Sequence, residues 1–177
     1  MAIASTGAVS SLAHTSKVLV FALGPEEYGV EILRVREIIG MLDITPLPQM
    51  PAYVKGVINL RGRIIPVIEL RGKLGLDPAA YTEKTCIVIL EVQDTSTGEM
   101  YPMGAIVDSV REVLDLATDQ VQPPPKFGGS VNIESITGLA KVRDRVIALL
   151  DVVRTFAGDE QASAVLRGRL AESGQAA

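Results

Sequence analysis

The chain has 177 residues, of which 47% are hydrophobic, and a formal net charge of −4 at pH 7. This length suits one ordinary domain or two small ones, and the apolar share is large enough for a real core. The core must be mainly aliphatic, because aromatic residues make up only 4% and Trp is absent. The negative charge argues against nucleic acid and anionic membrane surfaces as ligands, since both are bound through clustered Lys and Arg.

The N-terminal region predicts a tail followed by two strands and a turn. Residues 1–16 are small and polar, which is typical of a disordered tail. The apolar run at 17–23 predicts a first strand, the Gly-Pro sequence at 24–27 predicts a turn, and 28–32 predict a returning strand. The apolar spacing at 32–39 fits a short helical turn that passes into a strand.

A proline loop and a hairpin follow. Three prolines exclude residues 45–51 from a central strand, because proline lacks the ladder donor, so an extended loop is predicted. In residues 56–71, two apolar runs flank Arg61-Gly62-Arg63, which is typical of a β-hairpin with glycine in its turn. The arginines at the tip form either a simple solvated turn or a binding feature. Pro66 predicts that the second strand is an edge strand or contains a bulge.

The second half of the chain repeats the first. The hairpins align at an offset of 82 residues, which superimposes Gly56 on Gly138, Arg61 on Arg143, Arg63 on Arg145 and Glu69 on Asp151. The segment Val35-Arg36-Glu37-Ile38 likewise matches Val110-Arg111-Glu112-Val113. The order of elements is the same in both halves, so the repeat predicts two copies of one small domain. Each copy is small enough to be only marginally stable alone, so the two are expected to pack together.

The remaining elements are predicted from the same signals: a short helix or turn at 71–76, strands at 86–92 and 100–107, a turn and strand at 108–116, a loop at 122–137, a second hairpin at 138–153 and a helix within 155–172. Many short strands with Gly and Pro turns indicate an all-β sandwich or barrel. Closing each set protects the strand edges. We therefore predict two small five-stranded SH3-like barrels packed side by side, with short helical turns and a C-terminal helix.

The predicted domain organisation follows the repeat. Residues 1–16 form the N-terminal tail and 17–157 form the domain, with one subdomain at about 17–78 and the other at about 85–157. An exchange of strands between the subdomains is left open. Residues 158–177 are assigned to a C-terminal helix or tail.

No motif supports catalysis, a cofactor or a metal site. Histidine and cysteine do not cluster at ligand spacing, and phosphate-loop spacing is absent. The one histidine, His14, lies in the tail and leaves Cys86 without a base, so Cys86 is interpreted as a core residue in a reducing cytoplasm. An enzyme using carboxylates such as Asp43 and Glu69 and a small-barrel nucleic-acid-binding protein remain as alternatives. No apolar run approaches the roughly 20 residues needed to span a bilayer, and no secretory signal is evident.

Taken together, these motifs resemble the CheW family of bacterial chemotaxis coupling proteins. The resemblance covers about residues 18–156 and rests on the sequences at 28–33, 35–38, 44–48, 54–62, 65–71 and 107–113, and on Gly138-Leu139 with the second hairpin. The Asn-Leu-Arg-Gly hairpin is specific to CheW-like domains. Such domains also occur in the chemotaxis histidine kinase and fused to receiver domains, but no kinase or receiver sequence is present here.

The resemblance implies a non-catalytic cytoplasmic adapter without a cofactor, which is a monomer when alone. Such an adapter ties chemoreceptor tips to the chemotaxis histidine kinase by binding the kinase's CheW-like regulatory domain and the receptor's helical hairpin. It is recruited to membrane-associated arrays through these partners, without membrane insertion or nucleic-acid binding. The family's partner contacts fall on Val35, Glu37 and Arg61, and Arg63 shares the same hairpin tip. Val30, Ile32 and Val107 either line a groove between the barrels that takes an apolar helical ridge or are buried core.

Overall fold

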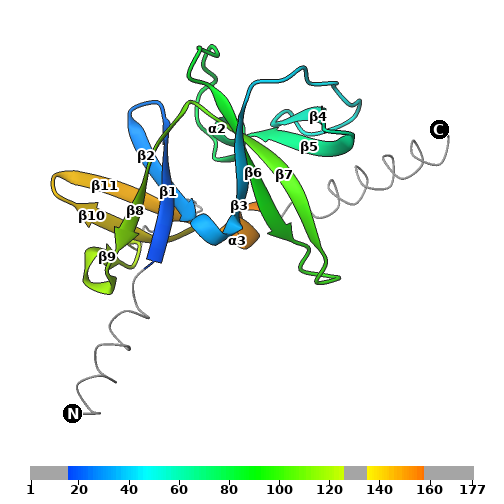
Figure 1. Ribbon diagram of the computed structural model, residues 1–177. Coiled ribbons are helices and arrows are strands. Elements are labelled where there is room, and N and C mark those ends of the chain that lie inside the picture. The colour runs from blue at the N-terminus through cyan, green and yellow to red at the C-terminus, as the bar shows by residue number, and fades with distance from the viewer. Residues whose placement is uncertain (1–15, 126–134, 158–177) are drawn as a thin grey trace.

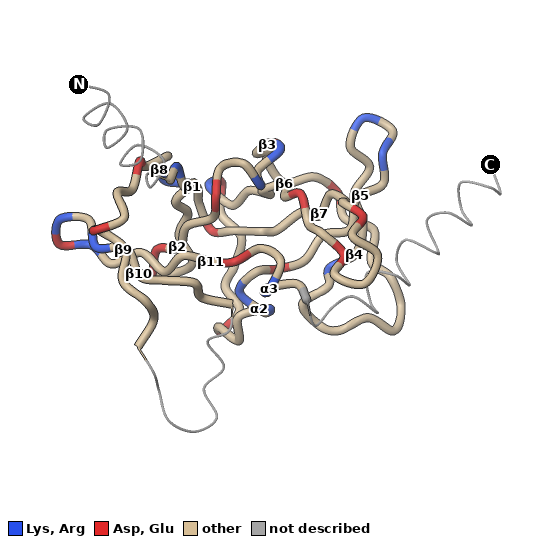
Figure 2. The backbone as a smooth tube through the Cα atoms, turned by 90° about the horizontal axis from the view of Figure 1, so that it is seen from below, with Lys and Arg blue, Asp and Glu red and all other residues tan. Residues whose placement is uncertain are grey.

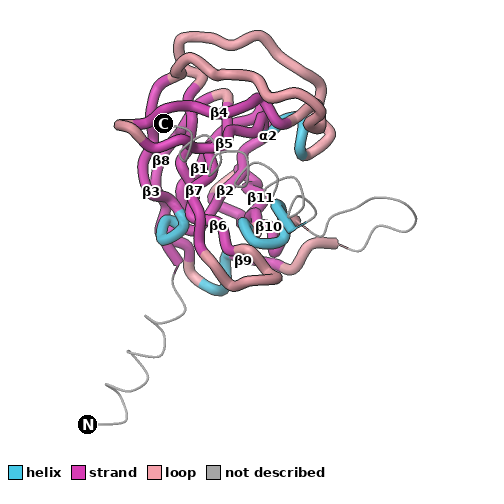
Figure 3. The backbone as a smooth tube through the Cα atoms, turned by 90° about the vertical axis from the view of Figure 1, so that its right-hand side faces the viewer, coloured by secondary structure: helices cyan, strands magenta, loops and turns pink. Residues whose placement is uncertain are grey.

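The computed structural model describes residues 16–125 and 135–157, and these residues are mainly β-strand (Figure 1). The strands are β1 Ser16–Leu23, β2 Glu26–Glu31, β3 Val35–Gly40, β4 Val54–Leu60, β5 Arg63–Glu69, β6 Cys86–Gln93, β7 Met100–Val107, β8 Ser109–Leu116, β9 Val121–Gln122, β10 Ile136–Val142 and β11 Arg145–Leu150. The helical segments are the 3₁₀ turns η1 Ile32–Arg34 and η2 Thr118–Gln120 and the short helices α2 Leu70–Lys73 and α3 Val152–Ala157. They lie around the strands, which occupy the centre of the molecule (Figure 3).

Two sheets form the fold, as the sequence predicted for an all-β protein with two small barrels. The six-stranded sheet has the order β8-β1-β2-β11-β10-β9, and the five-stranded sheet has the order β3-β6-β7-β5-β4. Each sheet contains one parallel pair, β11 with β2 and β5 with β7. Each sheet also takes strands from both halves of the chain. The predicted boundaries at 17–78 and 85–157 divide the chain by its repeat, whereas each sheet combines strands from both sides of that division.

Several predicted segments lie wholly or partly outside the described residues. These are the tail at 1–16 up to its last residue, the centre of the 122–137 loop, and the C-terminal segment at 158–177. Among the described residues, no helix is long and apolar enough to cross a membrane.

Strand β1 explains how the two sheets share one molecule. Its side chains alternate between two directions, as strand geometry requires. Leu19, Phe21 and Leu23 enter the core between the sheets, whereas Val18 and Val20 enter the interior of the six-stranded sheet. Strand β6 behaves in the same way toward the five-stranded sheet. Burial on both faces accounts for the continuous apolar runs that marked these strands in the sequence.

The hairpin at the end of the five-stranded sheet has a two-residue turn. Arg61 and Gly62 have φ angles of 51° and 86°, and two positive φ angles match the twist of a tight hairpin. The side-chain oxygen of Asn59 accepts a hydrogen bond of 2.8 Å from the Gly62 N–H. The turn is therefore one residue shorter than the predicted tripeptide, and Arg63 is the first residue of β5.

The prediction that Pro66 marks an edge strand is wrong. Strand β5 lies between β4 and β7. Pro66 pairs with Val57 of β4, and the recorded pairing with β7 begins one residue later, at Val67. A bulge does occur, but it lies in the partner strand β4, where the register shifts between Val54 and Gly56.

Gly56 and Gly138 occupy the equivalent bulges of the two hairpins. Gly56 has a φ of 139°, and a Cβ atom there would lie 1.9 Å from the backbone oxygen of Thr45. This close approach lets Thr45 and Val57 exchange hydrogen bonds of 2.8 and 2.9 Å, which anchors the proline loop to β4. At Gly138 the neighbour is β9, where a Cβ atom would lie 2.9 Å from a Val121 side-chain carbon. The repeated glycine thus admits a neighbouring segment in each copy.

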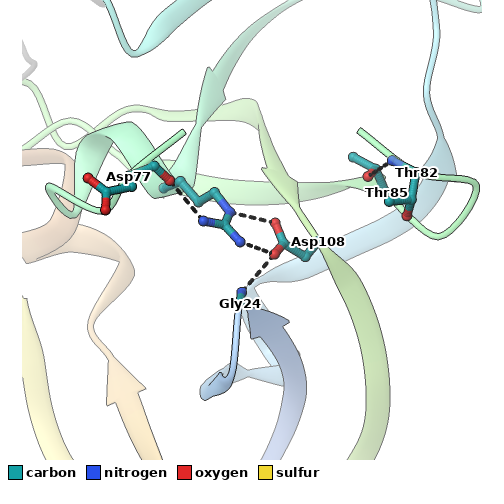
Figure 4. Close-up of polar contacts among 6 residues, drawn as sticks. Gly24, Asp77, Thr82, Thr85 and Asp108 are labelled. Atoms are coloured by element: carbon teal, nitrogen blue, oxygen red, sulfur yellow. Dashed lines mark hydrogen bonds and ion pairs between the residues drawn. The ribbon is translucent and has the colours of Figure 1, made fainter. Parts of the chain in front are cut away.

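One residue, Asp108, carries the chain from β7 of the five-stranded sheet to β8 of the six-stranded sheet. Its carboxylate accepts hydrogen bonds from Arg71 Nε (2.9 Å) and Nη2 (2.5 Å) and from the Gly24 N–H (2.7 Å) (Figure 4). Arg71 also donates a hydrogen bond of 2.8 Å to the main-chain oxygen of Asp77. This cluster joins the β1–β2 turn, α2 and the crossing. The hydrogen bonds from Arg71 lower the pKa of Asp108 below its ordinary value of 3.8.

Replacing Asp108 by Asn is expected to lower the free energy of unfolding at pH 7 by about 1–3 kcal/mol, because hydrogen bonds to a charged group are lost. The depressed pKa means that the carboxylate stabilises the fold above about pH 4 and loses this effect as the pH falls through the folded-state pKa. The difference between wild type and variant should therefore shrink below that pH. Chemical denaturation at several pH values measures it.

The matched control for this experiment is Asp77→Ala, because Asp77 contacts Arg71 through its main-chain oxygen and the variant keeps that bond. Equal losses of stability for the two variants would contradict the claim that the Asp108 carboxylate stabilises this crossing through its hydrogen bonds with Arg71 and Gly24.

Replacing Gly56 by Ala is expected to cost about 3 kcal/mol of stability, because a strained φ angle combines with a collision against backbone. Gly138→Ala should cost less, about 1–2 kcal/mol, because Gly138 has no strained φ angle and the nearest backbone atom, the Gln122 oxygen, would lie 3.0 Å from the new Cβ atom. Thermal and denaturant unfolding of both variants make the comparison. A smaller loss for Gly56→Ala than for Gly138→Ala would refute the proposed anchoring of the proline loop.

Candidate functional site

A groove of about 220 Å³ lies at one end of the five-stranded sheet, and we call it the arginine groove. Its walls combine charged and apolar side chains: Arg36, Glu37, Leu60, Arg61, Arg63, Ile65, Ile89 and Pro102. Three residues singled out in the sequence, Glu37, Arg61 and Arg63, therefore meet at one place. The β4–β5 hairpin ends in a basic turn that projects beyond the rest of the five-stranded sheet (Figure 2).

Glu37 and Arg61 form an ion pair across the open side of the five-stranded sheet. Glu37 lies on β3 and Arg61 follows β4, and these two strands are the outer strands of the sheet. Arg61 Nη2 donates a hydrogen bond to Glu37 Oε2, and the two side chains are 71% and 33% exposed. A pair so open to water contributes at most about 1 kcal/mol to stability. Its charges are accessible to a partner.

The three arginines of the groove differ in their pairing. Arg36 contacts Glu91 at 3.3 Å, and Arg61 contacts Glu37. Arg63 is exposed, and within the part of the chain that the structure describes its side chain has neither an ion pair nor a hydrogen bond. The groove thus combines three cations with one lining carboxylate.

A bulge in β3 separates the groove from an apolar surface. The pairing with β6 shifts register between Val35 and Glu37. Val35 and Ile38 pair with residues of the core between the sheets, whereas Glu37 pairs with Ile89 on the interior side of the five-stranded sheet. One short strand therefore presents Val35 and Ile38 on one face, and Glu37 together with the half-buried Ile39 on the other.

The apolar surface, which we call the η1–β3 segment, consists of Ile32, Leu33, Val35 and Ile38. Leu33 is 90% exposed and Ile38 is 43% exposed. Ile32 and Val35 are half-buried and pack against the core between the sheets. The segment is an accessible apolar margin of that core.

Val30 and Val107 lie in the buried core, where they line a hollow of only about 10 Å³. They are 3% and 1% exposed and belong to the core between the sheets. Burial is one of the two interpretations that the sequence allowed for this pair, and contact with a partner at either residue stays a prediction. Inward alternation on strands packed from both sides explains the burial, since position in the sequence does not reveal which apolar residues stay at the margin.

Sequence reasoning missed a group of ion pairs on the six-stranded sheet, in which one arginine contacts two glutamates. Arg145 donates hydrogen bonds to Glu27 Oε1 (2.9 Å) and Oε2 (2.8 Å), and its Nη1 lies 3.0 Å from Glu112 Oε2. The hydrogen bonds that Arg145 donates to Glu27 lower the pKa of the Glu27 carboxyl group, and donation to Glu27 and Glu112 raises the pKa of Arg145. The repeat marked Arg145 and Glu112, but no signal linked either to Glu27, which is more than a hundred residues from Arg145.

Sequence reasoning also missed a hollow of about 480 Å³ on the six-stranded sheet. Its walls come from β1, β2, β8, β9, β10, β11, η1, η2 and α3, and its charged lining residues are Glu31, Arg34, Asp151 and Arg154. No sequence motif could indicate a hollow whose walls come from so many separate elements.

Cys86 fits its interpretation as a packing residue. It is half-buried at the edge of the core between the sheets, and burial raises the pKa of its thiol. A raised pKa disfavours the reactive thiolate. Within residues 16–125 and 135–157, no three His, Cys, Asp or Glu side chains gather as metal ligands. His14 lies outside the described residues.

Comparison with known proteins gives consistent matches in sequence and structure. The family model of the CheW-like domain matches residues 17–160. The chemotaxis protein CheW of Klebsiella aerogenes is 36% identical over 162 residues, which cover 90% of this chain and 94% of that protein. The probable chemotaxis protein CheW of Rhizobium etli is 33% identical, with 89% of this chain and 98% of that protein covered.

The crystal structure of the scaffolding protein TtCheW from Thermoanaerobacter tengcongensis matches with a TM-score of 0.70. It is 33% identical, and the match covers 80% of this chain and 92% of that chain. The resemblance seen in the sequence motifs is thus confirmed, and the family match includes both sheets. The chain belongs to the family of CheW-like domain proteins.

Proposed function

We propose that this protein is a non-catalytic chemotaxis adapter that couples chemoreceptor cytoplasmic tips to the chemotaxis histidine kinase by binding both. Family membership supports a role in chemotaxis, and the matched structure is titled a scaffolding protein. The observation that carries the proposal is the bulged strand β3, which places two chemically different surfaces on opposite faces. Two such surfaces suit a protein that holds two partners.

The arginine groove is the surface that we assign to the kinase's CheW-like regulatory domain. Its mixed lining of arginines, Glu37 and aliphatic side chains suits a folded protein surface with both charged and apolar residues. The exposed pair of Arg61 and Glu37 acts mainly on specificity and on the rate of encounter, because rim charges contribute little net affinity.

The η1–β3 segment is the surface that we assign to the receptor tip. A helical hairpin offers an amphipathic face, and such faces dock on exposed aliphatic surfaces through residues spaced along one side of the helix. Leu33 and Ile38 supply exposed apolar contacts, while Val35 and Ile32 are fixed by packing against the core.

The adapter acts in the cytoplasm as a monomer that joins membrane-associated arrays through its partners. Neither interface needs high affinity, because binding one partner raises the effective concentration of the other. The nucleic-acid-binding alternative has no support in the family or in the relatives named above.

Calorimetric titrations with the kinase regulatory domain and with a receptor-tip fragment test this assignment. Arg61→Glu should weaken binding of the kinase domain by about tenfold or more, which is 1.4 kcal/mol, because it sets two carboxylates side by side. Leu33→Asp should weaken only the receptor fragment. Both residues are exposed, so unfolding midpoints should change little.

The control for Leu33→Asp is Val146→Asp, which makes the same change at a hairpin residue that is 58% exposed. It should leave receptor binding intact. Absence of binding between the wild-type protein and both partners would refute the adapter role, although the fold would stand.

A further inference from the structure

The repeat places Arg63 and Arg145 at equivalent positions in the two sheets. Each is the first residue of the second strand of its hairpin, Arg63 in β5 and Arg145 in β11. Each of these strands then pairs in parallel with a strand from the other half of the chain. The two arginines therefore stand in matching frameworks, and their surroundings can be compared residue by residue.

Arg145 is fully paired within its own sheet. Glu27 of β2 accepts two hydrogen bonds from it, and Glu112 of β8 lies within ion-pair distance. The guanidinium group is a planar fork whose geometry matches a carboxylate, so the pairing with Glu27 is both specific and strong. This end of the six-stranded sheet supplies its own counter-charges.

Among the described residues, Arg63 pairs with no equivalent of the two carboxylates, Glu27 and Glu112, that pair with Arg145. Glu37 corresponds to Glu112, but it pairs with Arg61. Sheet register identifies the other equivalent, because Val67 pairs with Gly104 just as its repeat equivalent Leu149 pairs with Gly29. Pro102 lies two residues before Gly104 in β7, and Glu27 lies two residues before Gly29 in β2, so Pro102 is the equivalent of Glu27. A proline side chain cannot pair with a cation.

Pro102 and Arg63 both line the arginine groove. The missing carboxylate thus leaves an exposed guanidinium above apolar side chains, including Leu60 and Ile65. The guanidinium group of Arg63 has no hydrogen-bond or ion-pair partner among the described residues, although the whole chain carries a net charge of −4. The groove is concave, has excess positive charge and has an aliphatic floor.

We propose that the arginine groove receives an Asp or Glu side chain of the partner protein, which pairs with Arg63 as Glu27 pairs with Arg145. This inference rests on the proposed function, so the partner is the kinase's CheW-like regulatory domain. The acidic residue lies next to an apolar side chain that covers Leu60 and Ile65. The carboxylate–arginine pair that forms within the six-stranded sheet at Arg145 is thereby formed between two molecules at Arg63.

Titrations of the kinase regulatory domain with four versions of the full chain test the inference. Arg63→Gln should weaken binding by about tenfold or more and reduce the dependence of affinity on salt, because one charge pair is lost. Arg63→Lys should retain part of the affinity, since it keeps the charge but loses the planar fork. The unfolding midpoint and receptor-tip binding should stay as in wild type.

The matched control is Lys141→Gln, which removes one exposed positive charge from β10 of the other sheet. It should change affinity for the kinase domain by less than twofold. If wild type binds and Arg63→Gln binds within twofold of it, the inference is wrong while the adapter role stands. If wild type does not bind the kinase domain, both are wrong.

A charge exchange identifies the partner's residue. Exposed Asp and Glu residues of the kinase domain are changed singly to Lys and titrated against Arg63→Glu. One of these changes should restore at least tenfold of the lost affinity. Loss of binding in Arg63→Gln without rescue by any exchange would overturn the carboxylate contact.

Discussion

The apolar contact between the two sheets is the constraint on which the rest of the structure depends. Strands β1 and β6 are buried on both faces, so neither sheet can be complete without the other. Each large aliphatic side chain buried there contributes about 1.5–3 kcal/mol relative to an exposed one. The chain passes from one sheet to the other twice, at η1 and at Asp108. The two hydrogen bonds from Arg71 to Asp108 fix the second crossing.

The same crossings determine where the two proposed partner surfaces lie. Leaving the core between the sheets, the chain passes through η1 into β3, and the bulge there turns Val35 and Ile38 toward the core margin and Glu37 toward the arginine groove. The internal repeat is visible in the matching hairpins, but the two ends have different charges. Arg145 is satisfied by Glu27, whereas Arg63 faces a groove with Pro102 in the corresponding place. The same repeated framework thus holds one arginine that is paired within its own sheet and one whose guanidinium group is exposed and, among the described residues, unpaired.

Much of the fold could be predicted from the sequence, because its strands are marked by local signals. Continuous β-branched runs located β1 and β6, and the glycine-containing turn located the β4–β5 hairpin within a residue. The distribution of strands between the sheets depends on pairings distant in sequence, and Pro66 was misplaced for that reason. The motif residues Glu37, Arg61 and Arg63 do meet at one groove. Val30 and Val107 were indistinguishable in sequence from residues at the margin, and only packing shows that they are buried.

The central claim is that two partners occupy opposite faces of β3 at the same time. The most direct measurement is the mass of the complex, by light scattering after size exclusion, in a mixture of this protein, the kinase regulatory domain and a receptor-tip fragment. The account predicts a single species that contains all three and does not form when this protein is left out. Two separate binary complexes, with one partner displacing the other, would contradict it.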